Sequence, residues 1–293
     1  MTTTKQLHTF HIPVMGLAYT IDSPIRVANY GISSVISIAD DELIEKMRAF
    51  YSEKFDVPYH EITQKIHDFR AERITSYLNL VDKIVKEKFE NFKTELSESK
   101  LALENYIAML PNKSEIKKGL EHLMEDGIAF KENIKNYLEN NLYSGDIDVN
   151  IMTKLDKDNF IKDEQLPVAF NDAHAALRGF ANSTLTSSVV LSAGMNPRLY
   201  SYFENFSDFF PDFNNNLKKK ITLKVSDFRS AMIQGNFLAK KGLWLLSIIL
   251  SWLYQPKLLR EPIKRVFPTP QNPRCNVPIK IHVLRQFQRL PER

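Results

Sequence analysis

SSVISIADDELIEKMRAFYSEKF, residues 33–55, decides the fold class, because it joins a short β-branched run directly to a helical stretch. We expect a buried strand over Ser33–Ile38. Asp40 and Asp41 follow the strand and can cap the next helix, since their carboxylates accept hydrogen bonds from the free N–H groups of a first turn. A strand followed at once by a helix is typical of parallel α/β sheets and barrels.

The same strand–helix order occurs on both sides of this stretch. Before it, FHIPVMG (residues 10–16) predicts a strand, and SPIRVANYG (residues 23–31) predicts a helix with Ser23 as its cap and Pro24 as its first residue. After residue 142, further strands are expected over Asp148–Thr153, Ser187–Leu191 and Ile221–Val225, each followed by a helix. The sequence therefore predicts an α/β fold with five strand–helix units, whereas a closed barrel of this type needs eight strands.

A helical segment interrupts this pattern between residues 60 and 142. Apolar residues recur there at helical spacing, as in Ile74, Leu78 and Val81, and β-branched clusters are few. Pro111 divides the segment, because proline ends a helix, so a helical hairpin is expected.

These boundaries give four regions. Residues 1–59 hold the first two strand–helix units, 60–142 the helical insertion and 143–244 three further units, and 245–293 form a divergent tail. The tail holds seven of the fourteen prolines and has no glycine, so we do not expect it to continue the α/β pattern beyond Trp244.

Charge is unevenly distributed along the 293 residues. The formal net charge is +4, but residues from 241 onward carry ten Lys and Arg against two Glu, which leaves the first 240 residues at −4. The body is therefore mildly acidic and gives no reason to expect nucleic acid as a partner.

The amino terminus and the cysteine content favour a cytoplasmic protein. MTTTKQLHTFHIP lacks the order of a secretory signal, and a single cysteine, Cys275, excludes an internal disulfide framework. The apolar run Leu243–Tyr254 has twelve residues, whereas about 20 are needed to span a bilayer, so no transmembrane segment is expected.

Candidate ligand-binding residues come from the loops that follow the strands, because ligands of α/β sheets bind at the carboxyl ends of the strands. Gly16 after Met15 permits a planar ligand to approach the backbone. Lys154 offers a positive charge, with a solvated surface charge as the alternative interpretation. Ser192 and Gly194 could present backbone N–H groups to an anion.

The histidines and glycines do not form the motifs of a metal site or of a phosphate-binding loop. His8 and His11 lie three residues apart and His60 and His67 seven apart, without a third ligand of the kind a metal site needs, so we expect no metal site. His174 reads as an ordinary helix residue. No glycine-rich phosphate-binding motif occurs in the chain.

HIPVMGLAYTIDSPIRVANYGISSVISI, residues 11–38, resembles the opening of the FMN-dependent TIM barrels of the nitronate monooxygenase and enoyl reductase type. In those enzymes a Pro-x-Met-Gly loop follows strand one and a Ser-Pro begins the first helix. More closely, residues 1 to about 244 resemble the amino-terminal part of an uncharacterised bacterial family of barrel proteins with the same helical insertion.

The resemblance implies an incomplete (β/α) TIM-type barrel that holds FMN at the carboxyl ends of its strands, with Met15 and Gly16 against the flavin and a small-molecule substrate. In the flavin enzymes a Gly-Gly-His segment carries the catalytic histidine and later glycine-rich loops bind the FMN phosphate. Neither segment has a counterpart after Trp244. No catalytic residue is therefore assigned, and whether the chain is an enzyme stays open.

Two functions follow as hypotheses. The first is a truncated FMN-dependent oxidoreductase-like barrel, nitronate monooxygenase-like in lineage and inactive as this chain. The alternative is a non-enzymatic interaction protein that binds a partner through the insertion. An incomplete barrel leaves an open sheet edge, so we also expect self-association through the strand near Ile221–Val225.

Overall fold

The computed structural model describes His8, Ile12 and residues 20–125, 130–192, 194–214, 216–251 and 280–284. The chain divides into two compact units. The first comprises Met1–Val149 and Asn182–Ser187, and the second comprises Asn150–Ala181 and Ser188–Arg293. Met15, Gly16 and most of the first expected strand lie outside the described residues, although Ile12 forms a single parallel bridge to Ser34.

The first unit begins as the sequence predicts. α1 (Ser23–Val27) and the 3₁₀ turn η1 (Ala28–Tyr30) lead into β1 (Ser34–Ile38), which is buried along its whole length. α2 (Asp41–Lys54) then begins where Asp40 accepts a 2.8 Å hydrogen bond from the Leu43 N–H, which confirms the predicted cap. Ser23, by contrast, is the first residue of α1 and not its cap.

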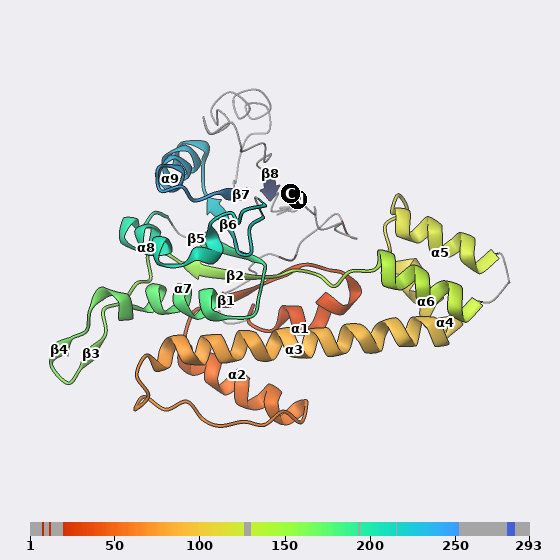
Figure 1. Ribbon diagram of the computed structural model, residues 1–293, viewed down its shortest axis with the longest axis horizontal. Coiled ribbons are helices and arrows are strands. Elements are labelled where there is room, and N and C mark those ends of the chain that lie inside the picture. Colours follow the sequence, from red (N-terminus) through yellow and green to blue (C-terminus); the bar gives the residue numbers. More distant parts are fainter. Residues whose placement is uncertain are drawn as a thin grey trace, which may run out of the picture. The chain divides into compact units, whose positions relative to one another are not determined.

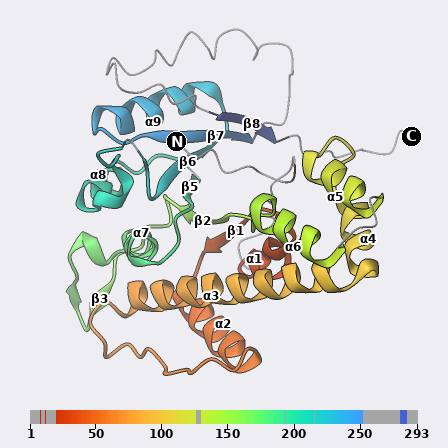
Figure 2. The same ribbon diagram turned by 45° about the vertical axis from the view of Figure 1, so that its right-hand side comes forward.

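The insertion is helical, but it contains more helices than the expected hairpin. They are α3 (Phe69–Glu98), α4 (Lys100–Met109), α5 (Glu115–Glu125) and α6 (Phe130–Asn141). Figure 1 shows α2 alongside α3, and both views place α4, α5 and α6 together at the other end of α3 (Figures 1 and 2).

Two local features end helices within the insertion. Ser99 has an extended backbone, and its hydroxyl caps α4 by accepting a hydrogen bond from the Ala102 N–H, so α3 cannot continue into α4. Leu110 is extended immediately before Pro111, as expected for a residue whose helical conformation the proline ring disfavours.

The end of the insertion has a hydrophobic core of its own. Side chains from α3 to α6 and from residues directly next to these helices form one buried cluster: Phe92, Leu96, Leu103, Tyr106, Ile107, Leu110, Ile116, Leu120, Ile134, Leu138 and Leu142. Burial of this apolar surface holds these helices together.

The second unit is built on a parallel sheet. β2 (Ile147–Met152) contains the division between the units and is followed by β5 (Ser188–Ser192), β6 (Lys220–Val225), β7 (Leu245–Ser251) and β8 (Lys280–Leu284). The strand order is β1-β2-β5-β6-β7-β8, and the pairs β5–β6, β6–β7 and β7–β8 are parallel.

Helices and a small hairpin connect these strands. α9 (Phe228–Lys240) packs on β6 and β7, and Figure 2 shows α9 running alongside β7. The remaining elements are the hairpin β3 (Phe160–Ile161) and β4 (Glu164–Gln165), the helices α7 (Asp172–Asn182) and α8 (Pro197–Tyr202), and the 3₁₀ turns η2 (Val168–Phe170), η3 (Phe203–Asn205) and η4 (Ser207–Phe209).

The α/β pattern continues past Trp244, contrary to the expected boundary. Leu245–Ser251, placed in the tail from its sequence, forms β7 in parallel register with β6, with Leu223 opposite Ile248. A strand in the interior of a parallel sheet is apolar on both faces, so its sequence is a continuous hydrophobic run. Without the alternation of a half-exposed strand, such a run can be mistaken for an apolar segment outside the α/β pattern.

The sheet confirms the mixed α/β class without confirming a barrel. Within the described residues the strands form an open order, with β1 and β8 at its two ends. β6, expected at the open edge, is paired on both sides, by β5 and by β7. The expectation of an open edge at β6 is therefore wrong, and self-association itself stays a prediction.

The helices can also be compared with what a membrane-spanning helix requires. In the part of the chain that the structure describes, no helix has both the length and the apolar character needed to cross a bilayer.

Candidate functional site

The structure brings two of the predicted ligand residues together. Lys154 follows β2 and Gly194 follows β5, and the Lys154 side chain lies against the Gly194 backbone. Gly194 has φ +104°, a backbone conformation that residues other than glycine rarely adopt. A β-carbon at residue 194 would lie 2.4 Å from Cε of Lys154 and 3.0 Å from its Nζ, so glycine keeps the space that the lysine occupies.

Ser192, the third residue expected at these strand ends, is the last residue of β5, and its expected backbone contact with an anion stays a prediction. It is buried, and its hydroxyl donates a long 3.4 Å hydrogen bond to the Ile151 carbonyl. Its own carbonyl accepts hydrogen bonds from the Thr153 N–H at 3.0 Å and the Thr153 hydroxyl at 2.9 Å. These bonds join the carboxyl ends of β2 and β5, and they give Ser192 a structural role.

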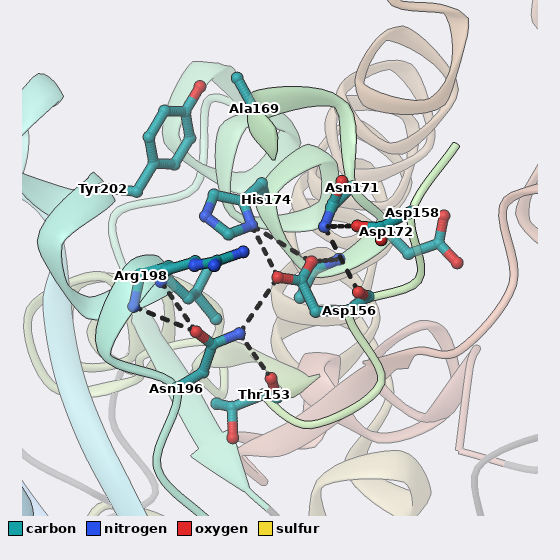
Figure 3. A network of polar contacts seen from close by, with 12 residues as sticks. Thr153, Asp156, Asp158, Ala169, Asn171, Asp172, His174, Asn196, Arg198 and Tyr202 are labelled. Atoms are coloured by element: carbon teal, nitrogen blue, oxygen red, sulfur yellow. Dashed lines mark hydrogen bonds and ion pairs between the residues drawn. The ribbon is translucent and has the colours of Figure 1, made fainter. Parts of the chain in front are cut away.

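A polar network that the sequence analysis did not identify lies at the same strand ends (Figure 3). Its centre is Asp156, four residues after the end of β2. One or other carboxylate oxygen accepts hydrogen bonds from the Ala173 N–H at 3.0 Å and from the Asn196 side-chain amide at 3.1 Å. The two oxygens lie 2.9 and 3.1 Å from Nδ1 of His174.

Asp156 thereby acts as a cap for α7. Its carboxylate binds the Ala173 N–H in the first turn of the helix, where free N–H groups and the helix dipole favour a negative charge. Asn171, which precedes α7, instead donates its side-chain amide to Asp158 at 2.7 Å. The helix that carries His174 is therefore positioned by the loop that carries Asp156.

Asn196 links the network to the loop after β5. Its side-chain amide also donates to the Thr153 carbonyl at 3.0 Å, and its side-chain oxygen accepts from the backbone N–H groups of Arg198 and Leu199 at 3.1 Å each. The residue therefore caps α8 and holds the ends of β2 and β5 at the same time.

Further bonds hold the loop between β2 and α7. The Asn159 side chain donates to the Phe170 carbonyl at 2.7 Å and to Asp172 at 2.9 Å. The Leu166 N–H donates to the Asn159 carbonyl at 2.8 Å, which joins the loop to β4. The loop is thus fixed at several points on either side of Asp156.

The electrostatics of Asp156 follow from these contacts. Burial raises the pKa of its carboxyl, since removal from water disfavours the charged form, but the hydrogen bond and charge of His174 and the hydrogen bonds from Asn196 and Ala173 outweigh burial. The net result is a pKa below the ordinary value of 3.8, so Asp156 is ionised at neutral pH.

His174 is 2% exposed and packs beside an aromatic ring. Its ring centroid lies 5.0 Å from that of Tyr202 on α8, and the Tyr202 hydroxyl accepts a 2.9 Å hydrogen bond from Arg178. The ring is therefore held on one side by Asp156 and bordered on another by Tyr202 (Figure 3).

The network escaped prediction because no local motif encodes it. Asp156 and His174 are 18 residues apart, and Asp156 and Asn196 are 40 apart. The available signals were an Asp shortly after a strand and Asn171-Asp172 at a helix start, which by themselves indicate capping.

Comparison with known proteins assigns no relative. No family model, curated protein or solved structure matches this chain. Among the described residues, no group of three or more His, Cys, Asp or Glu side chains is arranged to hold a metal ion. The site must therefore be interpreted from its own geometry.

Proposed function

We propose that this chain belongs to the lineage of FMN-dependent, nitronate monooxygenase-like barrels and binds FMN at the carboxyl ends of β2 and β5. The observation that supports the proposal is the contact between Lys154 and Gly194. It places an ammonium group beside a backbone segment that carries no side chain. An ammonium group is a recurrent partner of phosphate in proteins.

The donor set fits the phosphate end of a flavin nucleotide. Lys154 is exposed at the strand end, so its ammonium group can reach a ligand there. Gly194, which carries no side chain, leaves the room in which the Lys154 side chain lies at this strand end. Lys154 would hold the phosphate, and the flavin ring would supply the redox chemistry. A closed barrel is part of this proposal, as is the contact of Met15 and Gly16 with the flavin.

The experiment compares FMN with riboflavin, which lacks the phosphate. The full chain is titrated with each flavin, and binding is followed by quenching of flavin fluorescence. The change Lys154→Ala should weaken FMN binding by about 10- to 100-fold, as loss of a hydrogen bond to a charged group costs about 1.5–3 kcal/mol. Riboflavin binding should change little, because riboflavin offers no phosphate to the lysine.

Lys157→Ala is the matched control. Lys157 is exposed in the same loop and carries the same charge, so this variant corrects for a general loss of positive charge. If Lys154→Ala and Lys157→Ala weaken FMN equally, or if the wild-type chain binds neither flavin, the proposed site is wrong.

A second candidate function is partner binding by the insertion. Leu101 and Met109 on α4 are 67% and 55% exposed, whereas Leu103, Tyr106 and Ile107 of the same helix contribute to the buried cluster. The double change Leu101→Ser and Met109→Ser should then abolish binding of a protein partner while FMN binding stays as in wild type.

A further inference from the structure

Lys224 lies in the interior of the parallel sheet, close to the carboxyl end of its strand. It is the last residue but one of β6, which pairs with β5 on one side and with β7 on the other. Its neighbours Leu223 and Val225 are buried, whereas Lys224 is only half-buried. Because successive side chains of a strand point to opposite faces of the sheet, Lys224 lies on the less covered face of β6, where a ligand from solvent can reach it.

The ammonium group of Lys224 has no hydrogen-bond or ion-pair partner among the residues that the structure describes. Lys219, a fully buried lysine just before β6, is different. Its Nζ donates a 2.9 Å hydrogen bond to the Phe180 carbonyl and lies 4.6 Å from the centroid of the Phe180 ring. Lys219 therefore has a structural role, whereas the amine of Lys224 is available to a ligand.

The surroundings of Lys224 favour the neutral amine. Burial lowers the pKa of its ammonium group below the ordinary value of 10.5, because removal from water disfavours the charged form. The register places Ile249 of β7 opposite Lys224, so an apolar side chain lies beside it on the same face of the sheet. The neutral amine is the nucleophilic form of lysine, and it attacks carbonyl carbons.

Two buried hydroxyl groups lie on the same face of the sheet. Thr222 is two residues before Lys224, and Ser247 of β7 is opposite Thr222 in the parallel register. Their hydroxyl oxygens are 2.8 Å apart, and the two residues are 4% and 8% exposed. That bond uses one hydroxyl hydrogen, so the other has no acceptor among the described residues. A buried donor of this kind favours a ligand oxygen as its acceptor.

The spacing of these groups limits the size of the ligand. Residues two apart in a strand lie about 7 Å from each other, so the amine of Lys224 and the hydroxyl pair can contact adjacent groups of one small molecule. The amine requires a carbonyl carbon, and the hydroxyl pair requires an oxygen. A compound of a few carbon atoms with a carbonyl group and a hydroxyl group provides both.

We propose that Lys224 forms an imine with a small hydroxylated aldehyde or ketone, whose hydroxyl oxygen binds the Thr222–Ser247 pair. In this step the amine nitrogen attacks the carbonyl carbon, and a C–N bond forms. The carbonyl oxygen then leaves as water with the two hydrogens of the amine, and a C=N bond remains. No oxidant or reductant takes part, so the inference does not depend on FMN.

Reductive trapping tests the imine. The full chain is incubated at neutral pH, without flavin, with hydroxyacetone and sodium cyanoborohydride, which reduces an imine to a stable secondary amine. Peptide mass spectrometry then locates the modified lysines. Lys220 lies on the same face at the other end of β6 and is the internal control. We expect Lys224 to react about tenfold faster than Lys220, because a pKa lower by one makes the neutral amine about ten times more abundant.

If native Lys224 reacts no faster than Lys220, or becomes reactive only after unfolding in urea, the proposal fails. This outcome is read from the wild-type chain and does not require a variant to fold.

Acetone is the matched probe for the hydroxyl pair, because it has the same ketone and lacks the hydroxyl group. At Lys224, hydroxyacetone should be preferred over acetone by about fivefold more than at Lys220, the effect of one hydrogen bond. Thr222→Val keeps the shape of the side chain and should abolish this preference. Ser226→Ala, at an exposed hydroxyl just after β6, should preserve it. A preference that is absent in the wild type, or unchanged in Thr222→Val, would overturn the assigned ligand class.

FMN titration of the same wild-type samples separates this inference from the proposed flavin site. A chain that is trapped at Lys224 but binds no flavin contradicts only the flavin site. A chain that binds FMN but is not trapped at Lys224 contradicts only the imine.

Discussion

The carboxylate of Asp156 lies 2.9 Å from Nδ1 of His174, and 18 residues of chain separate the two. The loop after β2 supplies the acid and α7 supplies the imidazole, so the contact ties a strand end to the helix that follows it. Both side chains are largely removed from water, with 11% and 3% of their surfaces exposed. Each side chain therefore supplies part of the hydrogen bonding that its partner would otherwise obtain from water.

Asp156→Asn should lower the free energy of unfolding by about 1–3 kcal/mol, because a buried hydrogen-bonded charge is replaced by an amide that satisfies its partners incompletely. Urea denaturation monitored by circular dichroism measures the change. Asp158→Asn, which neutralises an exposed carboxylate in the same loop, should cost less. Equal losses in the two variants would show that the Asp156 contacts contribute no more than the hydrogen bond that Asp158 accepts from Asn171.

Stability should also depend on acid through Asp156. Its pKa in the folded chain lies below the ordinary value of 3.8, so the unfolded chain binds the proton first as the pH falls. The stabilisation is fully present above that ordinary value and is lost as the pH falls through the folded value. Urea unfolding of wild type and Asp156→Asn, from about pH 6 to about pH 3, should give curves that converge in acid. Curves that stay parallel would contradict this assignment.

Most strands were predictable, and the reasons for the failures are physical. β1 lies within the predicted Ser33–Ile38, and β6 begins one residue before the predicted Ile221, because buried β-branched runs bounded by polar residues have few other interpretations. β7 was missed because its neighbours in sequence, a proline-rich and basic tail, made an interior strand resemble foreign sequence.

The candidate site was only partly predictable. Lys154 and Gly194 were identified because the loops after parallel strands meet at one edge of a sheet. Asp156 and His174 were not, since each has an ordinary helix-capping or helical context and their contact exists only after β2, α7 and β5 have assembled. Short sequence patterns carry no information on such distant pairs.

Arg48→Met should destabilise the first unit by about 3–5 kcal/mol, because it leaves a buried carboxylate without its cation. Arg48 makes two hydrogen bonds to Glu45, at 2.6 and 2.9 Å, and Glu45 also accepts from the Ile62 N–H at 2.9 Å. Thermal and urea unfolding measure the loss. Lys46→Met on the same helix is exposed and should change stability little, so similar effects of the two changes would rule out the buried pair as the cause.

Gly145→Ala should destabilise the same unit by about 1–3 kcal/mol through overpacking. A β-carbon there would lie 2.0 Å from the carbonyl oxygen of Ile32 and 2.7 Å from the Ser33 nitrogen, and backbone atoms cannot rotate out of the way. The neighbouring change Ser144→Ala, at an exposed residue, is the control in urea denaturation. A Gly145→Ala protein as stable as this control would mean that the approach of these two segments is looser than described.

Gly194→Ala should reduce the preference for FMN over riboflavin without changing the charge of the chain. The added β-carbon would lie 2.4 Å from Cε of Lys154, so the lysine must move, and a backbone φ of +104° becomes strained at the same time. If Lys154 binds the phosphate, its displacement should weaken FMN by about tenfold, about 1.4 kcal/mol, and leave riboflavin almost unaffected. Fluorescence titration of both flavins on the variant measures this difference. In the double variant with Lys154→Ala the effect of Gly194→Ala on FMN should disappear, because the side chain that it displaces is gone, whereas additive losses would show that the glycine acts independently of the lysine.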